Sequence, residues 1–208
     1  MRLPRLYAVT DEKVLPNVRL IQKVAEVLEA GVRFLQLRFK KTPAREQLSL
    51  GQEIRVLTSK YNALLVINDS PELAKEIGAD GVHLGAEDPQ LSQARKILGP
   101  DAIVGVSCYE DMALVRRWSP DDVSYVGLSS PYPSTTKHKE KVSMPGFREL
   151  VGASRLPCYA IGGITPENVS EMMGAGCWGI AVISAVFGAG NPASQTRRFL
   201  AELERLNC

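Results

Sequence analysis

Short apolar segments alternate with longer amphipathic segments along almost the whole chain. Runs of five to seven mostly apolar residues are typical of buried strands, and they occur at 5–9, 32–38, 63–69, 80–84, 102–107, 123–129, 157–163 and 178–184. A helical spacing of apolar positions predicts helices at 18–31, 43–60, 70–78, 89–99, 109–118, 144–153, 165–176 and 191–206. Strands that alternate with helices predict βαβ units and a parallel sheet.

Eight such units favour an α/β fold, a single (β/α)₈ TIM barrel that takes in residues 1–208 as one domain. A doubly wound open sheet is the alternative that this pattern leaves. In a barrel, functional side chains follow the carboxyl ends of the strands. Polar residues at those positions are therefore the first candidates for a site.

The composition is that of an ordinary globular protein and excludes several classes. Of the 208 residues, 45% are hydrophobic and 23% are charged, and the formal net charge is +2. That charge is far from the basic balance of nucleic-acid-binding domains, and no apolar run is long enough to span a membrane. We therefore expect neither nucleic acid nor a membrane as a partner.

The cysteines and the N-terminus point to one compartment. The four cysteines lack a metal-binding or redox spacing, and Cys158 and Cys177 lie in apolar segments. We expect both to be buried thiols, as in a protein of the reducing cytoplasm. The first residues lead straight into a strand, so no signal peptide is expected.

Cationic and amide side chains follow the second strand with a spacing of two. Gln36, Arg38 and Lys40 would share one face of an extended chain. Inward charges are costly in a closed barrel unless they meet a partner, so an anion site is favoured over solvated side chains. Arg clamps phosphate oxygens through two N–H groups, and Lys acts as a point charge.

Two aspartates follow neighbouring strands. Asp69 and Asp88 each precede a predicted helix, where a single Asp most often caps the helix N-terminus. As a pair close to Arg38 and Lys40, they would instead suit an Mg²⁺ ion that also binds a substrate diphosphate. Mg²⁺ is therefore the expected metal.

Later strands are followed by candidate phosphate groups. The Ser-Thr-Thr-Lys stretch at 134–137 is typical of a solvated loop or of an anion-binding loop. Gly163 and Ser184 lie where barrels frequently bind phosphate through backbone N–H groups, although glycine also serves tight turns. We interpret His83, which would face into the barrel, as a core histidine rather than a base. Together these residues predict an enzyme with two phosphorylated ligands.

Several stretches resemble the thiamine-phosphate synthase (thiamine-phosphate pyrophosphorylase) family, in the family's order. They are "LYAVTD", "LQLRFK", "VINDSPELAKEIGADGVHLGAED", "YVGLSSPYPSTTK", "AIGGITPENV" and "GIAVISAVF". A single piece such as "AIGGI" is a weak signal, whereas the set Q-x-R-x-K, N-D, E-D and T-T-K is specific. The resemblance implies a TIM barrel that condenses hydroxymethylpyrimidine diphosphate with a thiazole phosphate, carboxylated or decarboxylated. The products would be thiamine phosphate and pyrophosphate.

Applied residue by residue, the resemblance also implies a ligand set. It implies that the pyrimidine diphosphate is bound by Gln36, Arg38, Lys40, Asn68, Ser107 and Lys137. It implies that Mg²⁺ is bound by Asp69 and Asp88. It implies that the thiazole phosphate is bound by Ser134, Thr135, Thr136, Gly163, Ile183 and Ser184. The expected catalytic groups, which stabilise the departing diphosphate, are Arg38, Lys40, Ser107 and Lys137.

Several positions depart from the family pattern, among them Ala86, Tyr109, Ser129, Ser130 and Trp178. Two other functions stay open. One is a sister thiazole tautomerase, which isomerises a thiazole phosphate carboxylate by proton transfer; its histidine corresponds to Tyr109 here. The other is a noncatalytic phosphate-binding barrel. The retained diphosphate groups and the missing histidine favour the synthase. A homo-oligomer is compatible with the sequence, which does not fix the oligomeric state.

Overall fold

Eight parallel strands close into one barrel in the computed structural model, which describes residues 2–85, 91–133 and 142–206. The strands are β1 (Leu6–Val9), β2 (Phe34–Leu37), β3 (Leu64–Asn68), β4 (Gly81–Leu84), β5 (Ile103–Tyr109), β6 (Tyr125–Ser129), β7 (Cys158–Ile161) and β8 (Gly179–Val182). Each strand pairs with the next, and β8 pairs with β1 to close the ring. The predicted (β/α)₈ barrel is confirmed and the open sheet is excluded.

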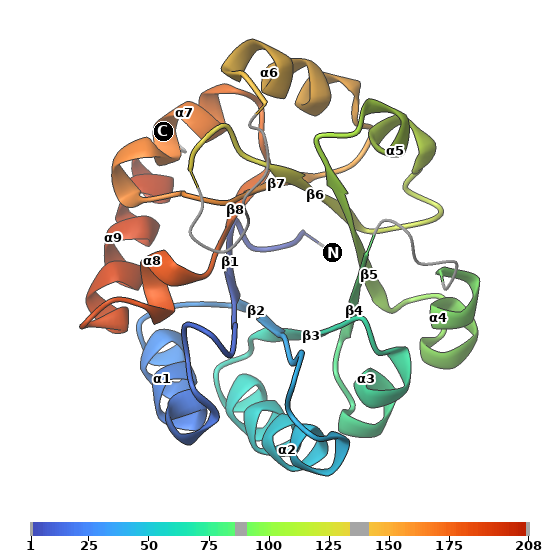
Figure 1. The fold of residues 1–208 in the computed structure, drawn as a ribbon, viewed down its shortest axis with the longest axis vertical. Helices are drawn as coiled ribbons and strands as arrows, with labels where there is room; N and C mark the ends of the chain where they lie inside the picture. Colours follow the sequence, from blue (N-terminus) through green and yellow to red (C-terminus); the bar gives the residue numbers. More distant parts are fainter. Residues whose placement is uncertain (1, 86–90, 134–141, 207–208) are drawn as a thin grey trace.

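Helices surround the strands on the outside of the barrel (Figure 1). They are α1 (Asn17–Glu29), α2 (Ala44–Lys60), α3 (Pro71–Ile77), α4 (Leu91–Leu98), α5 (Met112–Arg117), α6 (Met144–Ala153), α7 (Val169–Gly174), α8 (Ser184–Phe187) and α9 (Pro192–Arg205), with a 3-10 turn η1 (Pro166–Asn168) before α7. Several start at a polar cap whose side chain accepts from a first-turn N–H group, as Ser70 does for α3 and Asn191 for α9.

The structure departs from the predicted elements mainly at three places. The helix expected from 109 starts only at Met112, because β5 continues through an irregularity between Ser107 and Tyr109. The helix expected at 165–176 is divided into η1 and α7. The four-residue helix α8 was not predicted, since so short a segment shows no helical period.

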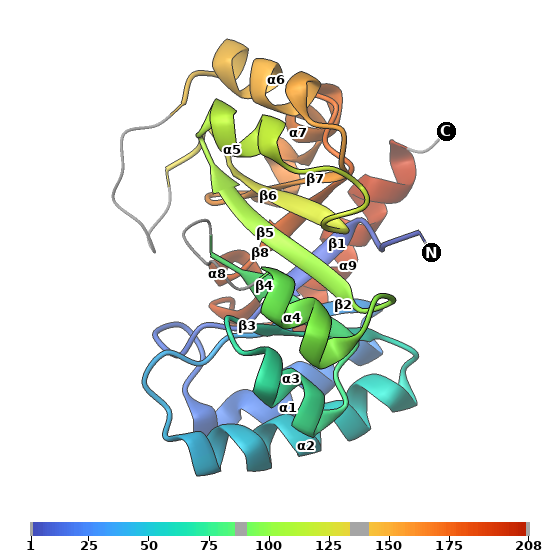
Figure 2. The ribbon, with the colours of Figure 1, turned by 90° about the vertical axis from the view of Figure 1, so that its right-hand side faces the viewer.

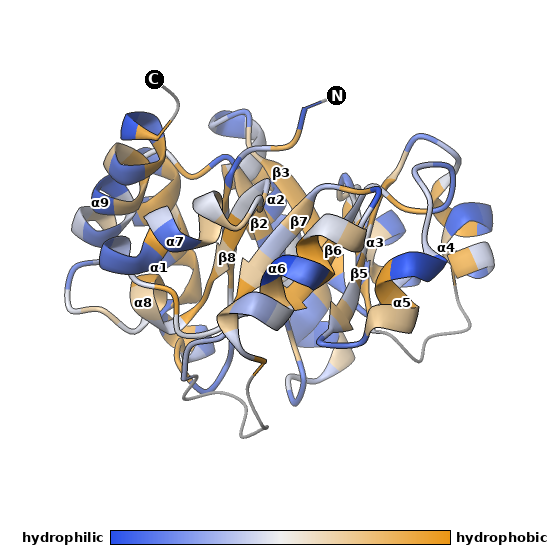
Figure 3. Ribbon diagram, turned by 90° about the horizontal axis from the view of Figure 1, so that it is seen from above, coloured by the Kyte–Doolittle hydropathy of each residue, from blue (hydrophilic) through white to orange (hydrophobic). Residues whose placement is uncertain are grey.

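Strand residues alternate between two apolar layers. Leu35 and Leu65 face outward and pack in the layer between strands and helices, whereas Phe34 and Val66 face the barrel axis. Because both faces of the barrel wall are buried, the strands are apolar almost throughout. Figure 3 shows them as largely hydrophobic, within helices of mixed character.

Four aromatic rings fill the middle of the barrel. Tyr7 stacks on Phe34 with ring centroids 4.0 Å apart, and Tyr125 and Tyr159 meet both rings edge-on at 5.5–5.9 Å. Gly105 makes room for this cluster, because a Cβ there would lie 2.1 Å from the Tyr125 ring carbon Cζ. The barrel interior is thus solid below the strand ends.

The amino end of the barrel is closed by Trp178. Its indole N–H donates to the Leu3 carbonyl at 2.9 Å, and the guanidinium groups of Arg2 and Arg5 lie 4.5 and 5.4 Å from the ring centroid. Trp178 directly precedes β8, so it lies at the end opposite the carboxyl ends of the strands, where the N-terminus also lies (Figure 2). This departure from the family pattern does not reach the expected site.

Cys108, Cys158 and Cys177 are buried free thiols, which confirms the expectation for the latter two. Burial raises the pKa of Cys177 to about 12, so the thiol stays protonated near neutral pH. Within 2–85, 91–133 and 142–206, no helix has the length and apolar character needed to cross a membrane.

Candidate active site

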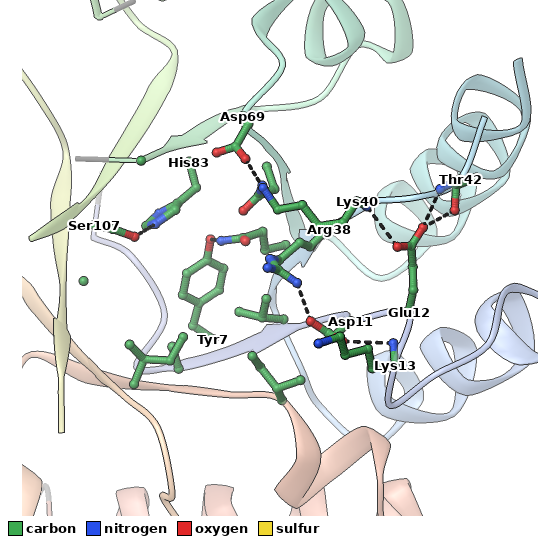
Figure 4. A pocket seen from close by; sticks show the side chains of 18 of the residues that line it. Tyr7, Asp11, Glu12, Lys13, Arg38, Lys40, Thr42, Asp69, His83 and Ser107 are labelled. Carbon is green, nitrogen blue, oxygen red and sulfur yellow. Dashed lines mark hydrogen bonds and ion pairs between the residues drawn. The ribbon is translucent and has the colours of Figure 1, made fainter. Parts of the chain in front are cut away.

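A pocket of about 790 Å³ opens at the carboxyl ends of the strands (Figure 4). Its size suits a small-molecule ligand. The predicted site residues that line it are Gln36, Arg38, Lys40, Asn68, Asp69, Ser107 and Ile183. They lie in or just after four different strands, so the barrel gathers residues that are far apart in the sequence.

Other predicted residues do not line this pocket or cannot be placed. Gly163 and Ser184 are not among its described lining residues. At Gly163, where φ is +59°, a Cβ would lie 2.1 Å from the Pro133 carbonyl oxygen, so this glycine allows a close backbone approach. The remaining predicted residues, Asp88, Ser134, Thr135, Thr136 and Lys137, lie outside the described residues.

Two groups of pocket residues differ in charge. Five charged residues at the opening, here called the rim, are Asp11, Glu12, Arg38, Lys40 and Asp69; Lys13, Lys41 and Glu46 also line the pocket. Five further polar lining residues lie within the strands and are here called the floor; they are Tyr7, Gln36, His83, Ser107 and Tyr125.

Arg38 is held at the rim by the end of β1. Its guanidinium forms an ion pair with Asp11, whose side chain is only 8% exposed, and its backbone N–H donates to the Thr10 hydroxyl at 3.0 Å. The prediction that Gln36, Arg38 and Lys40 share a strand face was wrong in part, because β2 ends at residue 37. Arg38 and Lys40 reach the pocket from the following loop.

Lys40 points toward Asp69 and forms an ion pair with it (Figure 4). Both side chains are partly exposed, at 47% and 40%. Asp69 does not cap α3, because Ser70 does so by accepting from the Leu73 N–H group at 3.2 Å. Asp69 has φ of +63°, a conformation that is uncommon for a residue with a side chain and that leaves its carboxylate over the pocket.

Glu12 holds the loop that carries Lys40. Its carboxylate accepts from the backbone N–H groups of Lys40, Lys41 and Thr42 at 2.8–3.0 Å, and from the Thr42 hydroxyl. Burial alone would raise the pKa of Glu12, but these hydrogen bonds outweigh it and the pKa lies below the ordinary value. The loop is therefore bound to a carboxylate that stays ionised.

The floor is mostly buried and contains no Asp, Glu, Lys or Arg side chain. Burial raises the pKa of Tyr7 and of Tyr125 well above the ordinary value of 10.0, so both phenols keep their protons. His83 is 9% exposed and faces inward, as expected from strand alternation. Beside the floor, the buried side-chain N–H₂ group of Asn68 has no hydrogen-bond partner among the described residues. Such an orphan group indicates that an acceptor belongs in the pocket.

The donor chemistry of the rim fits Mg²⁺ without forming a complete protein cage. Among the described residues, no three His, Cys, Asp or Glu side chains gather as a metal cluster. Asp69 supplies one partly exposed carboxylate. That suits Mg²⁺, which takes one or two carboxylates and completes its shell with water and substrate phosphate.

Sequence reasoning missed the acidic rim residues and the floor tyrosines. Asp11 and Glu12 follow β1 as Arg38 follows β2, so the strand-end rule, applied to the first strand, finds them. Tyr7 and Tyr125 occupy inward positions of strands that are apolar on both faces. Alternation is hidden in such strands, so the sequence offers little signal for these two.

The chain is similar to known proteins along nearly its whole length. A sequence profile of the family described as thiamine monophosphate synthase matches residues 6–186. Thiamine-phosphate synthase of Pyrococcus horikoshii is 40% identical over 204 residues, 96% of each chain, and that of Pyrococcus abyssi is 39% identical over 97% of this chain and 96% of its own. The solved structure of thiamine phosphate pyrophosphorylase from Pyrococcus furiosus superposes with a TM-score of 0.86, at 34% identity over 97% of this chain and 96% of its own.

Proposed function

Since the chain belongs to the thiamine monophosphate synthase family, we propose that it joins hydroxymethylpyrimidine diphosphate to a thiazole phosphate. The bond between the pyrimidine methylene carbon and the diphosphate oxygen breaks, and the diphosphate keeps the electron pair. The lone pair of the thiazole ring nitrogen forms the new carbon–nitrogen bond. The products are thiamine phosphate and pyrophosphate.

The main support for this proposal is that two positioned cations, Arg38 and Lys40, line the same pocket at the carboxyl ends of the strands. Arg38 and Lys40 line the same pocket, and Asp11, Glu12 and Asp69 hold their side chains or loop in place. Negative charge grows on the leaving diphosphate, and positioned cations stabilise that charge without reorganising during the reaction. Because the thiazole nitrogen attacks, no side-chain nucleophile is required.

Uncharged groups complete the proposed diphosphate site. Gln36, Asn68 and Ser107 lie in the pocket beside the cations, and the Asn68 amide has a buried hydrogen to donate. We assign all three to the pyrimidine diphosphate. Lys137, outside the described residues, is proposed as the third cation of that site.

We propose that Asp69 and Asp88 hold Mg²⁺. When bound, the ion would neutralise part of the diphosphate charge as it develops. Within the described residues, Lys40 keeps the Asp69 carboxylate over the pocket. That contact positions an oxygen ligand where a diphosphate would reach it.

For the thiazole phosphate we propose the loops that follow β6, β7 and β8. Ile183 lines the pocket directly after β8, and Gly163 follows β7. Ser184, Ser134, Thr135 and Thr136 complete the proposed phosphate contacts. Two reactants held side by side in one barrel mouth would react in an effectively unimolecular step.

The test is incubation of the purified protein with both substrates and Mg²⁺, followed by measurement of thiamine phosphate and pyrophosphate. We expect the two products in equal amounts, with no product when either substrate is left out. Isomerisation of the carboxylated thiazole phosphate without any pyrimidine would instead establish the tautomerase. Binding of phosphorylated ligands without turnover would leave only a noncatalytic barrel.

We further propose that residues 1–208 act as one barrel domain, since β1 to β8 belong to one closed sheet. The buried free thiols support the reducing cytoplasm as its compartment. Whether the barrel acts alone or as a homo-oligomer is tested by sedimentation, with a single species at the mass of 22.7 kDa expected only for a monomer.

A further inference from the structure

The five floor residues form one continuous chain of hydrogen bonds across the barrel. The Gln36 amide donates to the Tyr7 hydroxyl at 2.6 Å, and that hydroxyl lies 2.7 Å from the Tyr125 hydroxyl. The Tyr125 hydroxyl is 3.0 Å from Nδ1 of His83, and Nε2 of His83 is 2.9 Å from the Ser107 hydroxyl oxygen. The chain starts and ends at residues assigned above to the pyrimidine diphosphate.

The chemistry of its members gives this chain a direction. A phenol is a good donor and an unprotonated imidazole nitrogen is a better acceptor than a phenol oxygen, so Tyr125 donates to Nδ1 of His83. A neutral imidazole carries one proton, which must then be on Nε2 and point to Ser107. At the other end, Tyr7 accepts from Gln36, and its own hydrogen is satisfied by Tyr125.

The opposite direction would leave the buried Tyr7 hydroxyl hydrogen without an acceptor, as long as the Gln36 amide N–H donates to Tyr7. If Tyr125 donated to Tyr7, the Tyr7 hydrogen would have no acceptor among the described residues. An unmet buried donor is unfavourable, because the hydrogen bond it made to water is lost and not replaced. The seat of Tyr125 is also fixed, since only glycine at position 105 leaves space for its ring.

The direction of the chain decides what Ser107 offers to the pocket. When Nε2 of His83 donates to the Ser107 oxygen, the Ser107 hydrogen is not used by His83 and can point into the pocket that Ser107 lines. If the hydrogen bonds had the opposite direction, the Ser107 hydroxyl would donate to Nε2 of His83 and present only lone pairs to the pocket. Lone pairs would repel a phosphate oxygen, whereas the hydrogen binds it.

We propose that His83 is a positioning residue, a neutral Nε2–H imidazole that Tyr125 orients and that turns Ser107 into a hydrogen-bond donor for the departing diphosphate. The part concerning the diphosphate rests on the function proposed above. The tautomer itself does not, because it follows from contacts within the protein.

The tautomer can be read directly in the free protein. The chain has two histidines, His83 and His138, so nitrogen NMR of protein labelled at histidine shows two imidazoles, and the His138→Gln variant assigns them. At neutral pH we expect His83 with Nδ1 unprotonated and Nε2 protonated. An Nδ1–H tautomer or an imidazolium would overturn the proposal, whatever the enzyme's activity.

The Tyr125→Phe variant removes the phenol O–H and keeps the ring. We expect the Nε2–H tautomer of His83 to lose its preference, and kcat/KM for the pyrimidine diphosphate to fall about fivefold to tenfold, as expected for one hydrogen bond. The KM for the thiazole phosphate should not change. A changed tautomer with unchanged kinetics would contradict the positioning role.

Tyr159→Phe is the matched control, because it removes a buried phenol of the same aromatic cluster whose hydroxyl donates to the Pro4 carbonyl at 2.6 Å instead. It should leave the His83 tautomer as in the wild type. A shift equal to that of Tyr125→Phe would mean that general loosening of the core, not the chain, sets the tautomer.

Ser107→Ala separates this proposal from the proposed function. Because Tyr125 sets the tautomer, the free variant should keep Nε2–H at His83, while inorganic pyrophosphate should bind about tenfold more weakly than to the wild type. Equal pyrophosphate affinity would remove Ser107 from the anion site and overturn its donor role. Failure of the wild type to make thiamine phosphate would overturn the function but not the tautomer.

Discussion

The rim and the floor of the same pocket differ in the kind of polar group that they contain. The rim pairs full charges, Arg38 with Asp11 and Lys40 with Asp69, and all four side chains except Asp11 are partly exposed. The floor links hydroxyl, amide and imidazole groups through hydrogen bonds, and burial keeps the Tyr7 and Tyr125 phenols protonated. Charges are tolerable near water and expensive in the barrel interior, so each region uses the polar chemistry that its depth allows.

This difference indicates how the diphosphate and the ring of the pyrimidine substrate are divided between the rim and the floor. A diphosphate needs full positive charges, which the rim provides at the pocket opening. An uncharged pyrimidine ring can enter the deeper, neutral part without leaving a buried charge unpaired. The following variants would break or sharpen the contrast.

The largest effect is expected from Arg38→Ala. It removes a positioned donor from the leaving group and should lower kcat/KM for the pyrimidine diphosphate by about a hundredfold to a thousandfold. It also leaves the buried Asp11 carboxylate unpaired, which should cost about 3 kcal/mol of the free energy of unfolding. Steady-state kinetics and urea unfolding measure the two effects.

The double variant Asp11→Asn with Arg38→Ala separates them. Removing the unpaired charge should restore most of the lost stability and none of the lost activity. Recovery of activity together with stability would show that Arg38 only supports the fold.

Asp69→Asn should come next, with a loss of about a hundredfold at limiting Mg²⁺ if the carboxylate is a ligand. Its size is kept, so the protein should remain folded, as circular dichroism can check. Pyrophosphate release is measured as a function of Mg²⁺ concentration. An unchanged Mg²⁺ dependence would show that Asp69 is not a ligand of the metal.

Glu12→Gln should have a smaller effect, because it loosens the loop of Lys40 and leaves every proposed ligand group in place. We expect the KM for the pyrimidine diphosphate to rise about tenfold, with a smaller change in kcat. Glu26→Gln, which removes a partly exposed carboxylate paired with Lys23 on α1, is the control. Equal effects of the two variants would refute the role of Glu12.

The pH dependence of stability tests the same carboxylate. The pKa of Glu12 is lowered in the folded state, so its stabilisation is fully present above the ordinary value of 4.5 and is lost as pH falls through the lowered pKa. The stability difference between the wild type and Glu12→Gln, measured by urea unfolding, should therefore shrink on acidification below that value. A stability difference that grows on acidification would contradict the lowered pKa of Glu12.

The smallest effect is expected from Tyr159→Phe, beneath the floor. It leaves the Pro4 carbonyl oxygen without its phenol donor and should cost about 1 kcal/mol of the free energy of unfolding. Because that hydrogen bond points away from the pocket, thiamine phosphate formation should stay within about twofold of the wild type. A large loss of activity would show that the aromatic cluster and the rim are not independent.

The same contrast marks what the sequence could predict. Alternating apolar and amphipathic segments were enough for the barrel, and the strand-end rule brought Arg38, Lys40 and Asp69 to one mouth. The partners of those residues could not be predicted in this way. Asp11 meets Arg38 across 27 residues of sequence, and no local pattern encodes that contact.

The floor was hidden for a different reason. His83 was interpreted as a core histidine, and the structure does bury it, but its two hydrogen bonds depend on three separate strands. The short helix α8 and the left-handed conformation of Asp69 also depend on tertiary packing. Asp88 and the 134–137 stretch stay predictions, because they lie outside the described residues.

The most direct test of the assignment of the rim to the diphosphate is a set of four calorimetric titrations. Wild type and Arg38→Ala are titrated separately with the pyrimidine diphosphate and with the thiazole phosphate. The account predicts that the substitution weakens the diphosphate about tenfold or more and changes the thiazole phosphate affinity by less than about twofold. Equal losses for the two ligands would contradict it.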